Sequence, residues 1–318
     1  MLIFKGQVIF TIYFVLEGFP MEDAYSFDYE QIIDAEKAYD LFWSGVITDK
    51  RNFQCPETNC NAHITCANID KPRYLMKQVV NFRVVGDHST GCIHHPKNKG
   101  KNSNSESDNV GLRNRYIEDS VDVFLFERAK KKPSDNATGV GSKDHYDIKK
   151  RVYNERKQNT QRNPEYNTIK PLVSKYEEYR LSHQLNKHFI KIMTTQVSYS
   201  QMFINFDGLN IDNTSKYDRI YFGEAIVLKP KNTKAFIIKF DRKIIKDGKE
   251  FEPSIFIADS IITSHYCKNI WRNNLNELAT NKQKAMFYVY SKPRINEVNN
   301  SYLNFPITNL NYLDFRLI

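Results

Sequence analysis

The 318-residue sequence lacks several features that would define its class at once. It has no apolar run of 18 residues, which excludes a polytopic membrane protein. Its five cysteines are too few for a disulfide scaffold. It contains no P-loop, no Gly-x-Ser-x-Gly nucleophile elbow and no Rossmann glycine pattern. The apolar content of 41% and aromatic content of 13% suffice for packed cores, which excludes a wholly disordered chain.

The net charge of +9 is unevenly distributed along the chain. Residues 1–96 hold 8 basic and 12 acidic residues, a net of −4, whereas residues 97–165 hold 16 and 11, a net of +5. Residues 219–318 hold 16 and 9, a net of +7. Concentrated Lys and Arg indicate a nucleic-acid partner at the C-terminal end. The alternative is a charged surface that serves only solubility.

The changes in composition predict four parts of an α+β protein. They are a helix plus zinc-ribbon domain (1–96), a basic low-complexity linker of low order (97–167), a helical connector (168–210) and an OB-like β-barrel domain (211–318). The first twenty residues carry only a short apolar run without a cleavage site. They are either an extension ahead of a start at Met21 or a leading strand or helix that packs on the domain.

Two segments have apolar residues at helical spacing. Residues 28–43 predict an amphipathic helix capped by Asp28 and ended by Gly45. Residues 168–195 predict a second helix. Between them, the linker contains one short apolar segment, Val121–Phe126, which could form a strand or a docking element.

The strongest chemical signal is a pair of closely spaced ligand motifs. Cys55 and Cys60 form a Cys-x4-Cys pair, and His88 and Cys92 form a His-x3-Cys pair. Four N and S ligands in two pairs suit a tetrahedral Zn²⁺, and a site filled entirely by protein ligands is structural rather than catalytic. Turn residues at both pairs, joined by short strands at 63–68 and 79–85, predict a zinc ribbon.

Alternatives to this ligand set remain open in the sequence. A site without metal, with buried cysteines and surface histidines, is one of them. Four further residues could replace a ligand: His63, Cys66, His94 and His95. Thiolate ligands require a reducing compartment, so we expect a cytoplasmic protein.

The motif residues Cys55, Cys60, His88 and Cys92 resemble the N-terminal zinc-ribbon module of competence CoiA-like proteins, over about 45 residues. The resemblance implies that these four residues are the ligands and that a restriction-type nuclease domain follows. The closing segment departs from the family, because it reads FRVVGDHSTGC and lacks a His-Phe-x-His run.

A nuclease of that type needs an acidic residue and an Asp/Glu-x-Lys pair around a divalent metal. Asp241 and Lys243 supply such a pair, and Glu224 or Asp218 could supply the upstream acid. This combination arises easily by chance in a lysine-rich domain, so we favour a solvated strand face and expect no catalytic site. A metal-dependent nuclease of a defence or competence-type locus is the alternative.

The C-terminal hundred residues predict a β-β-β-α-β-β order, which is that of an OB-fold. Asp247 and Gly248 mark a hairpin turn, and Pro253 indicates an edge or a bulge. The predicted strands are 219–228, 235–245, 250–258, 285–290 and 302–318, with a helix at 265–279 and a break at Pro306.

Basic and aromatic residues on these strands predict a site for single-stranded DNA or RNA. Lys and Arg side chains bind phosphates, while aromatic rings stack on bases. The candidate contacts are Lys229, Lys231, Lys234, Lys239, Arg242, Lys243, Lys246, Tyr221, Phe256 and Tyr288. The sequence thus predicts a nucleic-acid-binding protein of bacterial DNA processing or defence. A protein-interaction adaptor is a further alternative.

Overall fold

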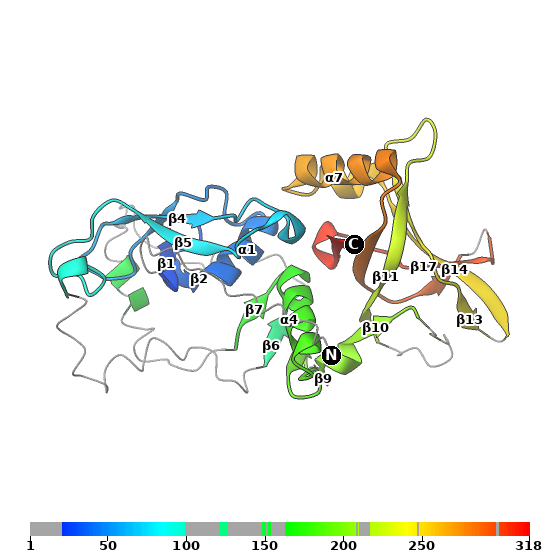
Figure 1. Ribbon diagram of the computed structural model, residues 1–318, viewed down its shortest axis with the longest axis horizontal. Coiled ribbons are helices and arrows are strands. Elements are labelled where there is room, and N and C mark those ends of the chain that lie inside the picture. Colours follow the sequence, from blue (N-terminus) through cyan, green and yellow to red (C-terminus); the bar gives the residue numbers. More distant parts are fainter. Residues whose placement is uncertain are drawn as a thin grey trace, which may run out of the picture.

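The computed structural model (Figure 1) describes most of the chain. The described residues are 21–98, 121–125, 148–150, 152–153, 163–207, 209, 217–246, 248–296 and 299–318. They form three sheets with a few helices, which confirms a mixed α+β protein. The first twenty residues and most of the predicted linker lie outside the described part.

The N-terminal sheet has five antiparallel strands in the order β2-β1-β3-β4-β5. Tyr25 is fully buried on β1, and the rings of Phe53 and Phe82 pack at a tilt in the core with centroids 5.2 Å apart. The strands are β1 (Asp23–Ser26), β2 (Gln31–Asp34), β3 (Phe53–Gln54), β4 (His63–Ala67) and β5 (Asn81–Val85). The strands expected at 63–68 and 79–85 are therefore present.

The helix expected at 28–43 begins later, and α1 spans Ala35–Trp43. Residues 23–34 form the β1–β2 hairpin instead, with Glu30 in the left-handed region at φ 57°. The N-cap is therefore Asp34, whose side chain accepts from the Lys37 N–H at 2.7 Å, and not Asp28. Asp28 instead accepts from the Thr48 N–H at 2.8 Å.

A middle layer combines one helix with a small sheet. The helix expected at 168–195 ends early, because α4 spans Lys170–Leu181 and the chain then turns into β8. The sheet order is β7-β6-β8-β9. Its strands are β6 (Asp122–Phe124), β7 (Glu165–Tyr166), β8 (Phe189–Ile192) and β9 (Thr195–Ser198), followed by α5 (Tyr199–Met202) and β10 (Phe203–Asn205).

The C-terminal sheet is built around one long strand, β11 (Arg219–Leu228). The first part of β11 pairs with β15 and its last part pairs with β12, both antiparallel. β14 and β17 pair with each other in parallel. The other elements are β12 (Phe236–Phe240), β13 (Ile244–Lys246), β14 (Lys249–Ile257), α6 (Asp259–Thr263), α7 (Lys268–Asn281), β15 (Ala285–Ser291), β16 (Arg294–Ile295), β17 (Tyr302–Asn304) and β18 (Leu313–Leu317).

The C-terminal sheet differs from the expected five-stranded barrel: it has nine strands, including β10 from outside the predicted barrel domain. Among the described residues, the sheet runs from β16 to β18 as an open path and does not close. The break expected at Pro306 separates β17 from β18. Asp247 of the predicted hairpin turn lies outside the described residues. Gly248 has φ 71° and directly precedes β14, which pairs with β13.

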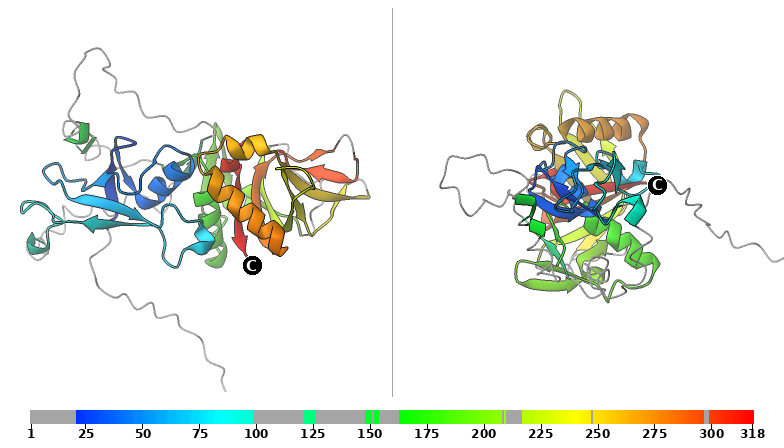
Figure 2. Two further views of the ribbon diagram at one scale, coloured as in Figure 1. Left: turned by 90° about the horizontal axis from the view of Figure 1, so that it is seen from above. Right: turned by 90° about the vertical axis from the view of Figure 1, so that its left-hand side faces the viewer.

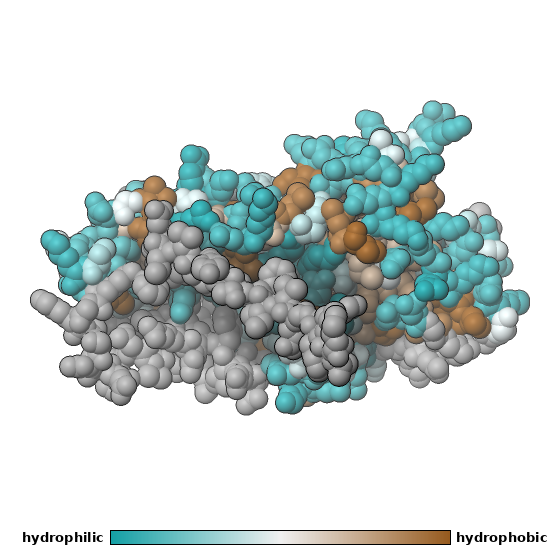
Figure 3. All heavy atoms as spheres, viewed as in Figure 1, coloured by the Kyte–Doolittle hydropathy of each residue, from teal (hydrophilic) through white to brown (hydrophobic). Residues whose placement is uncertain are grey.

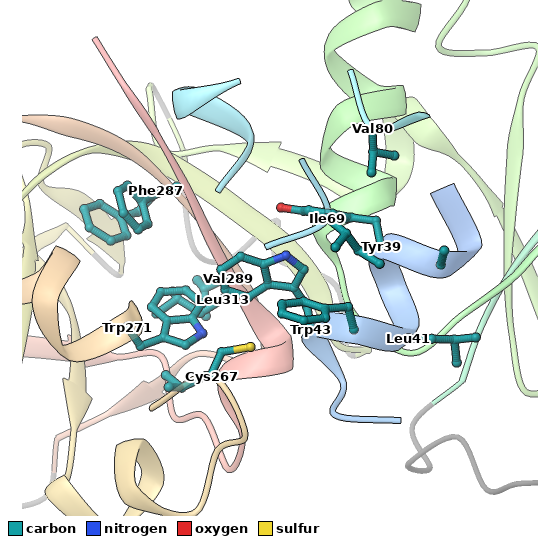
Figure 4. Close-up of a cluster of buried hydrophobic side chains, with 14 of the residues drawn as sticks. Tyr39, Leu41, Trp43, Ile69, Val80, Cys267, Trp271, Phe287, Val289 and Leu313 are labelled. Carbon is teal, nitrogen blue, oxygen red and sulfur yellow. The ribbon is translucent and has the colours of Figure 1, made fainter. Parts of the chain in front are cut away.

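The molecule is elongated, with the N-terminal and C-terminal sheets at opposite ends and α4 between them (Figures 1 and 2). Helix α7 covers one face of the C-terminal sheet, and α4 packs against part of the other. Trp43 of α1 and Trp271 of α7 meet at the junction, with ring centroids 6.5 Å apart (Figure 4). Because these rings belong to one buried cluster, a continuous core joins the two ends.

Polar groups reinforce this junction. The Lys170 ammonium lies 4.4 Å and 4.7 Å from the ring centroids of Trp43 and Trp271, and 2.9 Å from the Asp314 carboxylate. The buried Asp40 carboxylate of α1 accepts the backbone N–H of Thr168 at 2.8 Å, just ahead of α4. The N-terminal module is thus held directly to the start of α4.

Candidate metal centre and nucleic-acid interface

The predicted ligands lie in two tight loops at strand ends. In the first loop, between β3 and β4, the Cys55 N–H donates to Ala62 and the Cys60 N–H to Glu57, at 2.9 Å and 3.2 Å. The second loop follows β5, where Gly86 adopts φ 123° and the Cys92 N–H donates to Ser89 at 2.8 Å. Because β4 pairs with β5, the two loops meet at one end of the sheet.

The four predicted ligand atoms converge at that point. Those of Cys55, Cys60, His88 and Cys92 all lie within 4.8 Å of one another. The Sγ atoms of Cys55 and Cys92 are 3.7 Å apart, and His88 Nδ1 is 3.3 Å from Cys60 Sγ and 3.5 Å from Cys92 Sγ. Tetrahedral bonds of about 2.3 Å to sulfur and about 2.05 Å to nitrogen would separate S–S pairs by about 3.8 Å and S–N pairs by about 3.5 Å. These residues could therefore hold a metal ion.

The surroundings favour the thiolate at two of the three sulfurs, those of Cys60 and Cys92. The backbone N–H of Ser89 donates to Cys60 Sγ, and that of His94 donates to Cys92 Sγ, each at 3.4 Å. The hydrogen bond to Cys55 lowers the pKa of the Cys92 thiol to about 6, while the same contact and burial raise the pKa of Cys55. A bound cation would favour ionisation of all three thiols.

The alternative ligands do not join this group. Cys66 faces the core, where burial raises the pKa of its thiol. His63 is exposed, His94 packs its ring 5.7 Å from that of His88, and His95 accepts from the Lys97 N–H at 3.1 Å. Within the described ranges, no other set of three or more Cys, His, Asp or Glu ligand atoms converges.

The residues considered for a nuclease are only partly brought together. Glu224 lies on β11 and Asp241 directly follows β12, and the Asp241 N–H donates to the Glu224 carbonyl at 2.9 Å. Lys243, however, pairs with Glu250 at 2.5 Å, and Asp241 pairs with Lys284 at 2.5 Å. The Asp-x-Lys pair therefore does not share one site.

The C-terminal sheet has an open outer face over β11, β12 and β14. Directly paired residues on antiparallel strands point to the same side of a sheet. Ile237 pairs with Leu228 on one side and Phe256 on the other, and Leu228 and Phe256 are 40% and 56% exposed. We call these three residues the apolar row. Lys239, paired with Ile226 and Ser254, lies directly beside it.

Basic residues lie on the strands and loops near the apolar row, although Lys229 is directed toward α7 on the other face of the sheet. Lys231 and Lys234 are exposed in the β11–β12 loop, as is Lys229, which donates to Asn276 at 2.9 Å. Two others are in ion pairs of 2.7 Å: Lys239 with Glu252 and Arg242 with Asp207. The side chain of Lys246 lies outside the described part of the structure. Exposed pairs of this kind contribute little, so the basic groups can exchange a carboxylate for a phosphate.

Two predicted stacking residues are buried and cannot stack on a base. Tyr221 is fully buried on the face that α7 covers, and Tyr288 is 2% exposed on the opposite face, against α4. Tyr288 also donates to Glu177 of α4 at 3.2 Å. Of the three aromatic residues predicted to contact nucleic acid, Phe256 alone is exposed.

Two features of these sites were missed by the sequence reasoning. Ile226 and Leu228 were missed because residues 225–228 read AIVL, so the sequence is apolar on both faces of β11 there, although Leu228 is exposed. Lys149, which donates to the Cys60 carbonyl at 2.7 Å, gives no local signal because it lies 89 residues away.

The surface of Figure 3 is mainly hydrophilic, with hydrophobic patches over both ends of the molecule. No helix in the described part is long and apolar enough to cross a membrane. Comparisons with protein-family models, with curated proteins and with solved structures found no match.

Proposed function

We propose that the N-terminal module is a zinc ribbon in which Cys55, Cys60, His88 and Cys92 hold a structural Zn²⁺. One S–S separation of 3.7 Å and two S–N separations of 3.3 Å and 3.5 Å, close to those of a tetrahedral zinc site, carry this proposal. All four positions are filled by protein, so the ion would stabilise the fold rather than activate water. The absence of disulfides among the five cysteines is consistent with a reducing, cytoplasmic location.

Metal analysis of matched cysteine variants tests the zinc site. Wild-type protein should hold about one zinc per chain, and Cys60→Ala should lose it. The control is Cys66→Ala, which removes a buried cysteine of the same sheet outside the cluster and should retain the zinc. Equal zinc contents in the two variants would contradict the assignment.

We propose further that the protein binds single-stranded nucleic acid on the open face of the C-terminal sheet. Supporting this, Phe256 is a 56% exposed aromatic side chain beside Lys239, with the exposed lysines of the β11–β12 loop nearby. A ring offers a stacking surface to a base, while lysines bind the backbone phosphates. The net charge of +7 over 219–318 favours a polyanion as the partner.

The strand order also supports this proposal. β11, β12 and β14 precede α7, β15 and β17 follow it, and β14 pairs in parallel with β17, as in the OB-like order, to which β13, β16 and β18 are additions. OB-folds bind oligonucleotides across the second and third strands, which here are β12 and β14. The apolar row crosses these two strands.

Fluorescence anisotropy with labelled single-stranded DNA and RNA of about 20 nucleotides tests this function. Binding should appear at about 50 mM salt and weaken steeply as salt rises. Phe256→Ala should weaken binding about 5- to 150-fold, corresponding to a stacking contribution of about 1–3 kcal/mol. The control is Phe189→Ala, which removes a 37% exposed ring from β8 in another sheet. No binding at low salt, or equal effects of the two variants, would refute the proposal.

A further inference from the structure

A short segment far along the chain packs beside the metal centre. We call residues 148–150, 152 and 153 the Lys149 segment; they are drawn as short green pieces at the left of Figure 1. Lys149 is only 2% exposed, and its ammonium donates to the Cys60 carbonyl at 2.7 Å and to the Gln54 Oε1 at 3.1 Å. Both acceptors belong to the first ligand loop or the strand that leads into it.

Apolar contacts hold the same segment on the N-terminal sheet. Val152 is 3% exposed and packs in one buried cluster with Tyr25 and Ile32 of the β1–β2 hairpin. Ile148 and Tyr153 pack against this cluster from its edge. The position of Lys149 is therefore fixed from both sides, by the hairpin and by the ligand loop.

The chemistry of the centre explains why a buried lysine is found there. Three thiolates and a neutral imidazole around Zn²⁺ leave one excess negative charge. A buried charge is costly unless an opposite charge lies nearby. The Lys149 ammonium places a positive charge next to the backbone of the ligand residue Cys60. It also donates to Gln54, whose Nε2 in turn donates to Oδ1 of Asn61, the neighbour of Cys60, at 3.2 Å.

We propose that Lys149 is the charge partner of the metal centre, and that the bound metal in turn holds the Lys149 segment on the N-terminal sheet. This inference rests on the proposed zinc site and adds a positioning residue to it. Metal loading would thus extend its effect beyond the two ligand loops, to a segment about 90 residues away in the sequence.

Zinc release from full-length protein to a colorimetric chelator tests the charge role. Lys149→Met keeps the aliphatic length and removes the charge, and should release zinc about 10- to 100-fold faster than wild type. The matched control is Lys150→Met, which removes the exposed neighbouring charge and should leave release unchanged. Equal release rates in the two variants would overturn the charge role.

Hydrogen exchange of the wild-type protein tests the coupling without any variant. Stripping the zinc should raise exchange at the amides of the Lys149 segment at least about tenfold, because the ligand loop that Lys149 contacts loses its cross-link. Unchanged exchange there, in protein that does lose its zinc, would overturn the coupling while leaving the zinc site intact. Wild-type protein that holds no zinc at all would overturn the metal centre itself.

Discussion

Replacing Asp40 by alanine should destabilise the whole molecule strongly. Its carboxylate is fully buried and accepts the backbone N–H of Asn167 at 2.9 Å and 3.0 Å and that of Thr168 at 2.8 Å. The variant leaves two buried N–H groups without an acceptor, at about 1–3 kcal/mol each. We therefore expect the free energy of unfolding to fall by about 2–6 kcal/mol.

Urea unfolding followed by circular dichroism measures this loss. Asp70→Ala is the control, because Asp70 forms an exposed ion pair with Lys50 at 2.8 Å, and it should cost at most about 1 kcal/mol. Asp40→Asn retains one acceptor oxygen and should lie between the two. If Asp40→Ala costs no more than Asp70→Ala, the carboxylate does not hold α1 to the start of α4, and the reasoning is refuted.

Two further predictions concern the C-terminal sheet. Gly223→Ala should lower the free energy of unfolding in urea by about 1–3 kcal/mol, because its new Cβ would lie 2.8 Å from Phe206 Cδ2. The control is Gly91→Ala, whose new Cβ meets nothing within 4 Å and should change that free energy by less than about 0.5 kcal/mol. Burial raises the pKa of Asp314, but the nearby Arg316 and Lys170 together lower it by more, so the folded-state pKa lies below the ordinary value. The Asp314 carboxylate therefore stabilises the fold above the unfolded pKa of about 3.9, and this stabilisation is lost as pH falls through the folded pKa. Urea titrations from about pH 6 to pH 2 should therefore show a smaller loss of stability for Asp314→Asn than for wild type, and parallel curves would contradict this.

The four residues that could hold a metal could be found from the sequence because their spacing is local. Two pairs of ligands flanking predicted strands need only one hairpin pairing to converge, and β4 pairs with β5 as expected. Lys149 could not be found, because no pattern links a lysine in a polar stretch to a loop 89 residues before it.

The C-terminal strands were also predictable, since alternation along β12 separates Phe236 and Ile238 from Ile237 and Lys239. Alternation cannot tell which face another element covers. Tyr288 lies on the same sheet as the exposed Phe256, yet α4 covers it, and the position of α4 depends on long-range contacts such as that of Asp40 with Thr168.

Helical spacing misled in the N-terminal module. Ile32 and Ile33 fit the same helical pattern as Leu41, yet they lie on β2, which pairs with β1 across the turn at Glu30. Adjacent apolar residues suit a strand covered on both faces as well as a helix, and the packing of the hairpin decided between them.

Photo-crosslinking tests the central functional claim most directly. Single-stranded oligonucleotides carrying a photoreactive pyrimidine are irradiated with the full-length protein, and the crosslinked peptides are identified by mass spectrometry. We predict crosslinks on β12 and β14, at or beside Phe256 and Lys239, that disappear as salt is raised. Crosslinks confined to the N-terminal sheet, or none at low salt, would contradict the proposed binding face.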